Sequence, residues 1–452
     1  SEASLSKLDT TSKSYLLANA YLNGINQFIE EGATPLEFRL LGLKKEYYTI
    51  KDIFNVYGYM AFSFAQAHKT DPFLTAIGEK LGSAYLEDLD IHLNPGATLI
   101  QNYHRNLGTE VASNLSGAVN EIMETLPVPP FIGSNSWVIG AKKTKNGKVI
   151  LANDPHIGYS QPAVWYQSHI VTPEHEMYGF NLALTPFPLL GHNRKYAYGL
   201  TMFENDDIDF YLEDSLQQFD IRKEVIKVKD SDDIIFEVKT GRNGPVMNGL
   251  LNNLDSTKNI SMDWVYTRFS GDMIGVTYKI SHAKSLREFR DGVSEIHAPG
   301  LNVMYGDADN NIAWFAAAKL YRHAEGENTN LILDNRNGNK HVIEYFDFDQ
   351  NPQAVNPPWN YVYSANNQPG KVGDYLYPGY YVAEDRAKRI VQLLEAKKDF
   401  TGEDAKKMIN DVQSAIAPGL IRIISQNLTE VSFTENENKA LDILKKWDGT
   451  YT

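Results

Sequence analysis

The sequence contains no cysteine, so disulfide bonds, thiolate catalysis and cysteine-based zinc sites are excluded. It also lacks the run of about 18 apolar residues that a membrane-spanning helix requires. Positive charge is in deficit: the formal net charge is -14 at pH 7, which argues against nucleic acid or an anionic membrane surface as the main partner. The polar stretch 1–9 has no apolar signal-peptide core, which predicts either a cytosolic protein or a mature, trimmed chain.

Familiar catalytic signatures are missing as well. There is no G-x-S-x-G nucleophile motif, no H-E-x-x-H zinc motif and no glycine-rich phosphate loop. The chain does have 452 residues, 42% of them hydrophobic, which is enough for a large core and more than one domain. Its 26 tyrosines suit sheets and a ligand cleft better than a helical bundle.

The first part of the chain is predicted to be helical. Apolar residues recur with helical spacing between residues 15 and 25, and the run 32–35 (Gly-Ala-Thr-Pro) ends that helix. Thr49 and Asp52 predict a capped helix through Ala67, and Asp71-Pro72 is expected to open a third helix. A further helix is expected over 109–126, before the proline-rich segment 127–130.

From residue 160 to 345 the pattern predicts mostly strands, with one short helix over 284–295. Expected strands include 163–166, 176–180, 196–202, 234–238, 303–306 and 312–315, the last two joined by a turn at 310–311. Helices return over 383–397, 402–426 and 435–447. This order indicates an α+β protein in which helices pack on sheets.

Two apolar runs flank the segment 145–148 (Lys-Asn-Gly-Lys), and Asn-Gly in such a position predicts a tight β-hairpin. With Asn146 and Gly147 as the two loop residues, Ser134 would face Tyr159 and His156 would face Trp137. The hairpin would therefore bring His156 into the neighbourhood of Ser134. Alternation along the strands places the two side chains on opposite faces, so proximity rather than contact is expected.

Ser134 follows Gly133 at the start of an apolar run, and such a serine is most often only the first residue of a strand. It becomes a nucleophile if the peptide bond before it is cut. The α-amine of an N-terminal serine has a pKa of about 7.7–8 and can act as the base for its own hydroxyl. Gly133 allows the backbone to approach closely and to tolerate the strain that such a cut requires.

The stretch 134–137 (Ser-Asn-Ser-Trp) resembles the start of the β chain in the penicillin acylase (penicillin amidase) family of N-terminal nucleophile hydrolases. Further blocks resemble the family in the same order along the chain: 35–42, 153–158, 191–193, 206–209, 365–369 and 385–390. Similar blocks in one order over residues 15–450 are far more specific than any single motif.

The resemblance implies a four-layer αββα sandwich, the Ntn-hydrolase fold, with a helical α-chain segment. It implies a helical α-chain portion over 1–115, a spacer over 116–133 that is removed or cut on maturation, and a β-chain portion over 134–452. The two chains of one precursor would form a heterodimer located in the periplasm or outside the cell. Family members extend beyond both ends of the matching region, so the sequence is expected to be an internal portion of such a protein.

The resemblance also implies roles for single residues. Ser134 would be the nucleophile and its own α-amine the base, with His156 orienting that amine. The Met202 backbone N–H and the Asn366 side chain would form the oxyanion hole, and Arg386 would lie beside Asn366. Asn367 is the alternative if the register shifts by one residue.

An acyl pocket and a metal site follow from the same resemblance. The matching pocket positions are Met60, Phe64, Pro155, Ile157, Leu190 and Leu200. Aliphatic residues at 157 and 190 predict a preference for aliphatic or larger acyl groups over a flat benzyl ring. No cofactor is expected for catalysis, but a structural Ca²⁺ would be bound by the carboxylates of Asp206 and Asp209 and the carbonyl of Ile208, with Asp71 the nearest candidate for an α-chain ligand.

The sequence therefore predicts an amide hydrolase that cleaves itself between Gly133 and Ser134 and hydrolyses small N-acyl amides of the penicillin type through an acyl-enzyme on Ser134. Within the same class, an acylase for acyl-homoserine lactones or lipopeptides is the alternative. From another class, an unprocessed homologue that only binds is the alternative.

Overall fold

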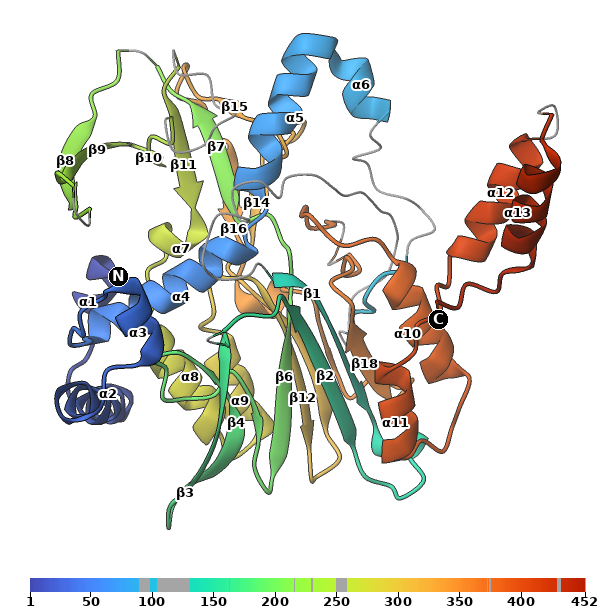
Figure 1. Ribbon diagram of the computed structural model, residues 1–452, viewed down its shortest axis with the longest axis horizontal. Coiled ribbons are helices and arrows are strands. Elements are labelled where there is room, and N and C mark those ends of the chain that lie inside the picture. The colour runs from blue at the N-terminus through green and yellow to red at the C-terminus, as the bar shows by residue number, and fades with distance from the viewer. Residues whose placement is uncertain are drawn as a thin grey trace.

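The computed structural model describes residues 1–88, 98–103, 131–161, 163–214, 216–228, 231–248, 258–371, 373, 375–428 and 432–451. Helices come first, a block of strands follows, and helices close the chain, as the α+β prediction requires (Figure 1). Within the described ranges, no helix is both long enough and apolar enough to cross a membrane. The helix expected over 109–126 and most of the expected spacer 116–133 lie outside the described residues.

Six helices make up the described N-terminal part: α1 (Glu2–Leu5), α2 (Lys13–Glu31), α3 (Leu36–Leu41), α4 (Ile50–Phe64), α5 (Ala67–Leu81) and α6 (Ser83–Asp88). The predicted helix starting at Thr49 is confirmed as α4, where Thr49 and Asp52 form a capping box. Pro72 does not open the third helix; it lies inside α5. The earlier start is stabilised by tertiary contacts, because His68 stacks on Phe62 and Asp71 accepts a hydrogen bond from Tyr380.

Two antiparallel sheets form the middle of the molecule. The larger has the strand order β17-β13-β12-β6-β5-β4-β3, and the smaller has the order β18-β1-β2. Their strands are β1 (Phe131–Ile139), β2 (Ile150–Ile157), β3 (Trp165–Val171), β4 (Glu176–Leu182), β5 (Leu190–His192), β6 (Tyr196–Met202), β12 (Leu301–Asp307), β13 (Ile312–Ala317), β17 (Gln353–Val355) and β18 (Tyr361–Ser364). The strands predicted around residues 165, 178, 199, 304 and 314 are thereby confirmed.

Three apolar clusters show how four layers stack. Val138 and Val362 of the smaller sheet meet Met304 and Trp314 of the larger one between the two sheets. The other face of the larger sheet packs on α8 (Met273–His282), α9 (Leu286–Val293) and α4. The other face of the smaller sheet packs on α10 (Asp385–Glu395) and residues that follow it. The result is the expected αββα sandwich, with the helices on the outer faces in Figure 1.

Smaller elements surround this sandwich. They are β7 (Ile208–Leu212), β8 (Asp220–Ile226), β9 (Ile234–Gly241), β10 (Gly244–Pro245), β11 (Ile260–Trp264), α7 (Val265–Arg268), β14 (Tyr321–His323), β15 (Leu333–Asp334) and β16 (Val342–Tyr345). The short helix predicted over 284–295 is confirmed as α9, whereas α7 and α8 interrupt a region predicted to be mostly strands. Residues 273–282 fold as a helix because their apolar side chains cover the large sheet.

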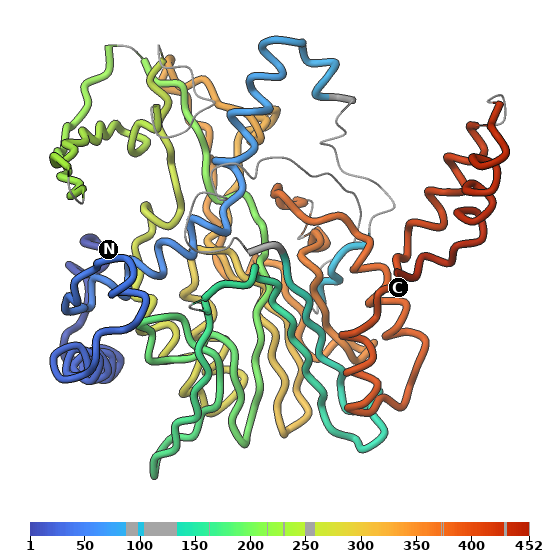
Figure 2. The backbone as a smooth tube through the Cα atoms, viewed as in Figure 1, coloured from blue at the N-terminus to red at the C-terminus, as the bar shows by residue number. Residues whose placement is uncertain are grey.

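At the C-terminal side the single helix expected over 402–426 is instead two helices, α11 (Gly402–Ile409) and α12 (Ala417–Asn427). The chain breaks between them because Asp385 accepts hydrogen bonds from the Ser414 hydroxyl and the Ala415 backbone N–H, and Arg389 pairs with Asp411. The last helix, α13 (Glu435–Lys446), is confirmed. The tube view shows α12 and α13 as a pair that extends away from the sandwich (Figure 2).

The hairpin register was predicted wrongly by four positions. Ser134 pairs with Pro155 rather than Tyr159, and His156 pairs with Gly133 rather than Trp137. The connection is longer than a two-residue turn because it is held by another part of the chain. The Lys145 backbone N–H donates to the Phe400 carbonyl, and the Phe400 N–H donates to the Lys143 carbonyl.

Candidate active site

Ser134 lies near the start of β1 and is 2% exposed. The preceding Gly133 passes so close to neighbouring groups that a Cβ there would lie 3.2 Å from Arg386 Nη2 and 3.3 Å from Asn366 Oδ1. A Cβ at these distances would be packed more tightly than usual, so the Arg386 and Asn366 side chains, which both contact Ser134, would have to shift by a few tenths of an ångström to admit it.

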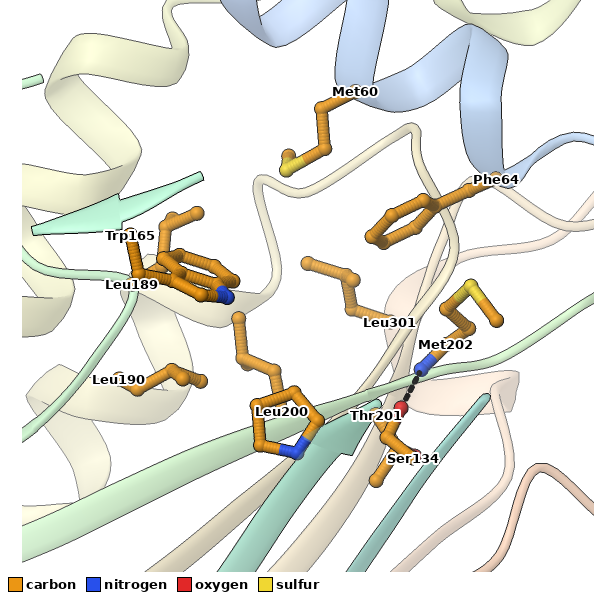
Figure 3. Close-up of a pocket in the computed structure, with 11 residues that line it drawn as sticks. Met60, Phe64, Ser134, Trp165, Leu189, Leu190, Leu200, Thr201, Met202 and Leu301 are labelled. Carbon is orange, nitrogen blue, oxygen red and sulfur yellow. Dashed lines mark hydrogen bonds between the residues drawn. The ribbon is translucent and has the colours of Figure 1, made fainter. Parts of the chain in front are cut away.

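Three residues that are far away in the sequence contact Ser134. The Met202 backbone N–H donates to Ser134 Oγ at 3.4 Å, as the dashed line in Figure 3 shows. The Ser134 backbone N–H donates to Asn366 Oδ1 at 2.7 Å. The Asn366 amide nitrogen in turn donates to the Met202 carbonyl at 2.8 Å, so Asn366 and Met202 are also hydrogen-bonded to each other.

Arg386, from the first turn of α10, completes this arrangement. Its Nη1 donates to the Ser134 carbonyl at 2.9 Å and its Nη2 donates to Asn366 Oδ1 at 3.0 Å. Burial lowers the pKa of the guanidinium, while the carboxylates of Glu204 and Asp154 act in the opposite direction. An arginine stays protonated under such conditions, so a fixed positive charge lies beside the serine.

The choice between Asn366 and Asn367 is decided by their contacts. The Asn367 amide nitrogen donates to the Thr98 carbonyl at 2.6 Å, and its oxygen accepts from the Ala365 backbone N–H. Only Asn366 contacts Ser134. Asn366 has a positive φ of 63°, an unusual conformation for a residue with a side chain, and this conformation directs its amide toward the serine.

His156 lies next to Gly133 across the hairpin, so strand alternation places its side chain on the face opposite to Ser134. Its ring Nε2 is 2.6 Å from Asp154 Oδ2, and this hydrogen bond lowers the pKa of the Asp154 carboxyl. His156 is near the serine in the backbone, but its ring is directed to Asp154. The orienting role implied for His156 stays a prediction.

An apolar cavity opens at Ser134 (Figure 3). Its empty volume is about 350 Å³, including the open mouth. The lining residues are Met60, Phe64, Ser134, Pro155, Trp165, Leu189, Leu190, Leu200, Thr201, Met202 and Leu301. Figure 3 shows Met60 and Phe64 reaching in from α4, opposite the strand that carries Leu200 and Met202.

Five of the six predicted pocket positions line this cavity, whereas Ile157 does not. Ile157 is the last residue of β2, two positions beyond Pro155 and paired with Phe131. Trp165, Leu189 and Leu301 line the cavity without having been predicted. Their apolar character in strands or loops gave no separate signal, because residues of that kind form most of the core.

Glu204, two residues after Met202, is a buried carboxyl that the sequence did not single out. Burial raises its pKa to about 8, although the positive charges of Arg386 and Lys69 lower it. Burial likewise lowers the pKa of the Lys69 ammonium to about 8. These groups make the side of the site beyond Met202 polar, in contrast to the apolar cavity.

The predicted metal residues lie in a buried acidic region. Neither carboxylate oxygen of Asp206 has a hydrogen-bond partner, and Asp71 Oδ2 has none. Burial, with the neighbouring Asp209 carboxylate, raises the pKa of both carboxyls well above the ordinary range. Asp209 itself faces His323, whose Nε2 is 2.9 Å from Asp209 Oδ1. In the described ranges no group of three or more acidic or histidine side chains has a spacing that could hold a metal ion.

The penicillin amidase family model matches residues 1–452. This chain belongs to the penicillin amidase family. One relative, an acyl-homoserine lactone acylase of Pseudomonas aeruginosa, is 24% identical, over 96% of this chain and 56% of its own length. A penicillin G acylase of Escherichia coli is 23% identical, over 70% of this chain and 39% of its own length. The chain spans about half the length of the curated relatives it matches, or less.

A solved structure has the same fold as this penicillin amidase family member. It is the thermostable penicillin G acylase of Alcaligenes faecalis, with a TM-score of 0.62 and 21% sequence identity. The match covers 70% of this chain and 59% of that chain. It confirms the Ntn-hydrolase fold that was expected from the sequence.

Proposed function

We propose that this chain carries the catalytic centre of an amide hydrolase with Ser134 as its nucleophile. The observation that carries the proposal is the meeting of Met202, Asn366 and Arg386 around Ser134 at the mouth of an apolar cavity. A hydroxyl, hydrogen-bond donors and a fixed positive charge beside an apolar pocket are the parts that acyl transfer needs.

In the reaction, Ser134 Oγ attacks the carbonyl carbon of an N-acyl amide while the α-amine of Ser134 takes the hydroxyl proton. The Met202 N–H stabilises the negative charge on the carbonyl oxygen. The Asn366 side-chain nitrogen, which donates one hydrogen to the Met202 carbonyl, supplies its second N–H to the same oxygen. The bond between the carbonyl carbon and the substrate nitrogen then breaks, and the leaving amine takes the proton that the Ser134 α-amine holds. The acyl group stays on Ser134 as an ester. Water, deprotonated by the same α-amine, releases the carboxylic acid.

This mechanism requires cleavage between Gly133 and Ser134, which creates the α-amine and divides the protein into an α chain and a β chain. In the uncut chain the Ser134 nitrogen is a peptide amide that donates to Asn366. After cleavage the same nitrogen is an amine beside the Ser134 hydroxyl. Gly133, with no side chain to collide with Arg386 and Asn366, supports this site of cleavage.

The substrate we propose is a small N-acyl amide whose acyl group is apolar and aliphatic. Leucines at positions 189, 190, 200 and 301 with Met60 are five of the eleven residues that line the cavity, against two aromatic ones, Phe64 and Trp165. The names of the relatives support acyl-homoserine lactones and penicillins as the two substrate types to test first. A strong kinetic preference for phenylacetyl amides over medium-chain aliphatic amides would contradict this choice.

The deciding experiment is intact-mass analysis of the full-length protein combined with an amide hydrolysis assay. Wild-type protein should yield two chains divided before Ser134, and Ser134→Ala should yield one chain without activity. Ser136→Ala is the matched control, since its hydroxyl donates only to the Ala152 carbonyl within β1–β2. The control should lose about 1 kcal/mol of unfolding free energy and still be cleaved.

A wild-type chain that remains uncut and inactive after long incubation would contradict the proposed hydrolase. It would favour the alternative, a homologue that binds acylated compounds without turnover. Binding of an N-acyl amide to that uncut chain, measured by calorimetry, would then identify this second function.

We further propose that Ca²⁺ is bound between Asp71 and Asp206. The support is the set of buried carboxylate oxygens without partners, which is costly unless a proton or a cation compensates the charge. Ile208 could add a backbone carbonyl, while Asp209 would first have to release His323. Calcium should raise the unfolding temperature of the wild type and chelation should lower it, with no response in Asp206→Asn. An equal calcium response in that variant would exclude the site.

A further inference from the structure

The strand β8 is the edge strand of the small sheet β10-β9-β8, and in the described part of the chain no element pairs with its other side. All seven of its side chains are at least partly exposed. Figure 1 shows β8 at the outer side of the molecule, away from β1 and β18. An exposed edge strand presents unpaired backbone groups to which another strand can bind, so the question is which strand fits here.

The pairing of β9 with β10 determines which backbone groups of β8 point outward. The Val246 backbone N–H donates to the Lys239 carbonyl at 2.8 Å, so the Lys239 backbone groups are directed to β10 and away from β8. Lys239 lies opposite Ile221, and Ile221 therefore forms no ladder hydrogen bond with β9. The N–H and C=O groups of Ile221, and by alternation those of Lys223 and Val225, point to the open side of the sheet.

The charges along β8 select the partner. The strand carries Asp220, Arg222, Lys223 and Glu224, and charged side chains usually prevent an edge strand from pairing with another chain. A second copy of β8 is an exception, because an antiparallel strand centred on Lys223 places Arg222 of each copy opposite Glu224 of the other. Two ion pairs would form across this contact, in addition to the ion pair that Arg222 and Glu224 form within each strand.

Only the register centred on Lys223 is self-complementary. A centre at position 222 would place two arginines opposite each other, and a centre at position 224 would place two glutamates opposite each other. The register centred on Lys223 also places Ile221, which is 58% exposed, opposite Val225, which is 55% exposed. Lys223 would lie beside its own copy, and Glu237, whose Oε1 is 3.3 Å from the Lys223 Nζ, compensates that charge in each protomer.

We propose that β8 is a self-association edge, at which two copies of this chain pair antiparallel through residues 220–226, centred on Lys223. The two three-stranded sheets would then join into one continuous sheet. The proposal is independent of the proposed amide hydrolase, because no residue of β8 contacts the Ser134 site. Two short strands bury much less surface than the roughly 1,600 Å² of a standard interface, so we expect a transient dimer with a Kd on the order of 10 to 100 μM.

The test is sedimentation equilibrium of the intact chain at about 0.15 M salt, where ion pairs are only partly screened. The wild type should show a monomer–dimer equilibrium. Arg222→Glu and Glu224→Arg each place like charges opposite each other and should weaken self-association by about tenfold or more. An equimolar mixture of these two variants should associate as the wild type does, because each variant then meets its complement.

Arg194→Glu is the matched control for charge reversal. Arg194 pairs with Glu176 at 3.0 Å on β4, which belongs to a different sheet. The control should leave the monomer–dimer equilibrium unchanged.

A second pair of variants tests the backbone contact. Lys223→Pro removes an outward-pointing N–H but no hydrogen bond to β9, so it should abolish the dimer without lowering the unfolding temperature of the monomer. Lys223→Ala keeps that N–H and removes the like charge at the centre, so it should associate at least as tightly as the wild type.

Several results would overturn the proposal. One is a wild-type chain that stays monomeric at about 500 μM, well above the expected Kd. If segment 220–226 of that monomer were protected from hydrogen exchange, other residues of the same chain would be covering the edge. A dimer that persists in Arg222→Glu or in folded Lys223→Pro would use another surface. A mixture of the two charge variants that does not associate would contradict the register, and this mixture decides if Lys223→Pro does not fold.

Discussion

At Gly133 the lack of a side chain leaves room for the Arg386 and Asn366 side chains, which contact Ser134. A Cβ there would lie 3.2 Å from Arg386 Nη2 and 3.3 Å from Asn366 Oδ1, closer than side chains normally pack. We predict that Gly133→Ala displaces the guanidinium and slows chain cleavage by about tenfold or more, because small displacements in a catalytic arrangement cost that much. Mass spectrometry over time measures the fraction of cut chain.

The control for that substitution is Gly24→Ala in α2. Apart from the chain neighbours and the backbone of α2 itself, no described atom lies within 4 Å of the added Cβ at that position. Alanine is favoured over glycine inside a helix, so the variant should gain about 1 kcal/mol of unfolding free energy and be cleaved at the wild-type rate. Equal cleavage rates of Gly133→Ala and wild type would show that the close approach is not needed.

At the scale of single elements, capped helices differ in how strongly they are coupled to the core. Thr49 caps α4, most of whose buried residues belong to the main apolar cluster, and Thr434 caps α13, which has no buried residue. We predict that Thr49→Ala lowers the global unfolding free energy by about 1 kcal/mol. Thr434→Ala should leave the global value unchanged and only increase hydrogen exchange in α13. Urea unfolding measures the global unfolding free energy, and hydrogen exchange measures local opening of α13. If both variants lost the same global unfolding free energy, α13 would be coupled to the core as strongly as α4.

At the scale of the whole molecule, a histidine pair joins the β3–β4 turn to the end of α8. The rings of His175 and His282 stack with centroids 3.8 Å apart. Burial lowers the pKa of His282 from its ordinary 6.5 to about 4, and the neighbouring His175 adds to this effect. The folded protein therefore binds a proton at His282 less readily than the unfolded chain does. The contribution of neutral His282 to the unfolding free energy is complete above pH 6.5 and is lost as the pH falls toward 4.

We predict that His282→Phe, which can still stack but cannot be protonated, loses less stability on acidification than the wild type. Urea unfolding at about pH 7.5 and about pH 4.5 measures the change for each protein. The unfolding free energy of His282→Phe should therefore rise relative to that of the wild type as the pH falls. Parallel losses in both proteins would show that this histidine does not contribute to acid destabilisation.

Much of the chain's local structure was determined by nearby residues. The helical spacing of apolar side chains and the residues at helix ends predicted α2, α4, α9 and α13. Both depend only on residues within one or two helical turns of each other. The αββα fold and the residues around Ser134 were expected only through the resemblance to a family. Nothing in the local sequence at 202, 366 or 386 indicates that these residues meet.

The tertiary structure decided what local patterns could not. The β1–β2 register depends on Phe400, which binds Lys143 and Lys145 and so lengthens the connection. The end of α11 and the early start of α5 likewise depend on distant partners, Asp385 and Tyr380. The cavity at Ser134 likewise depends on packing across the fold, because Met60 and Phe64 of α4 line it together with Leu200 and Met202 of the large sheet. The sequence by itself determined the serine, the glycine before it and most elements, since these depend on neighbours along the chain. Which groups surround that serine depends on packing across the fold.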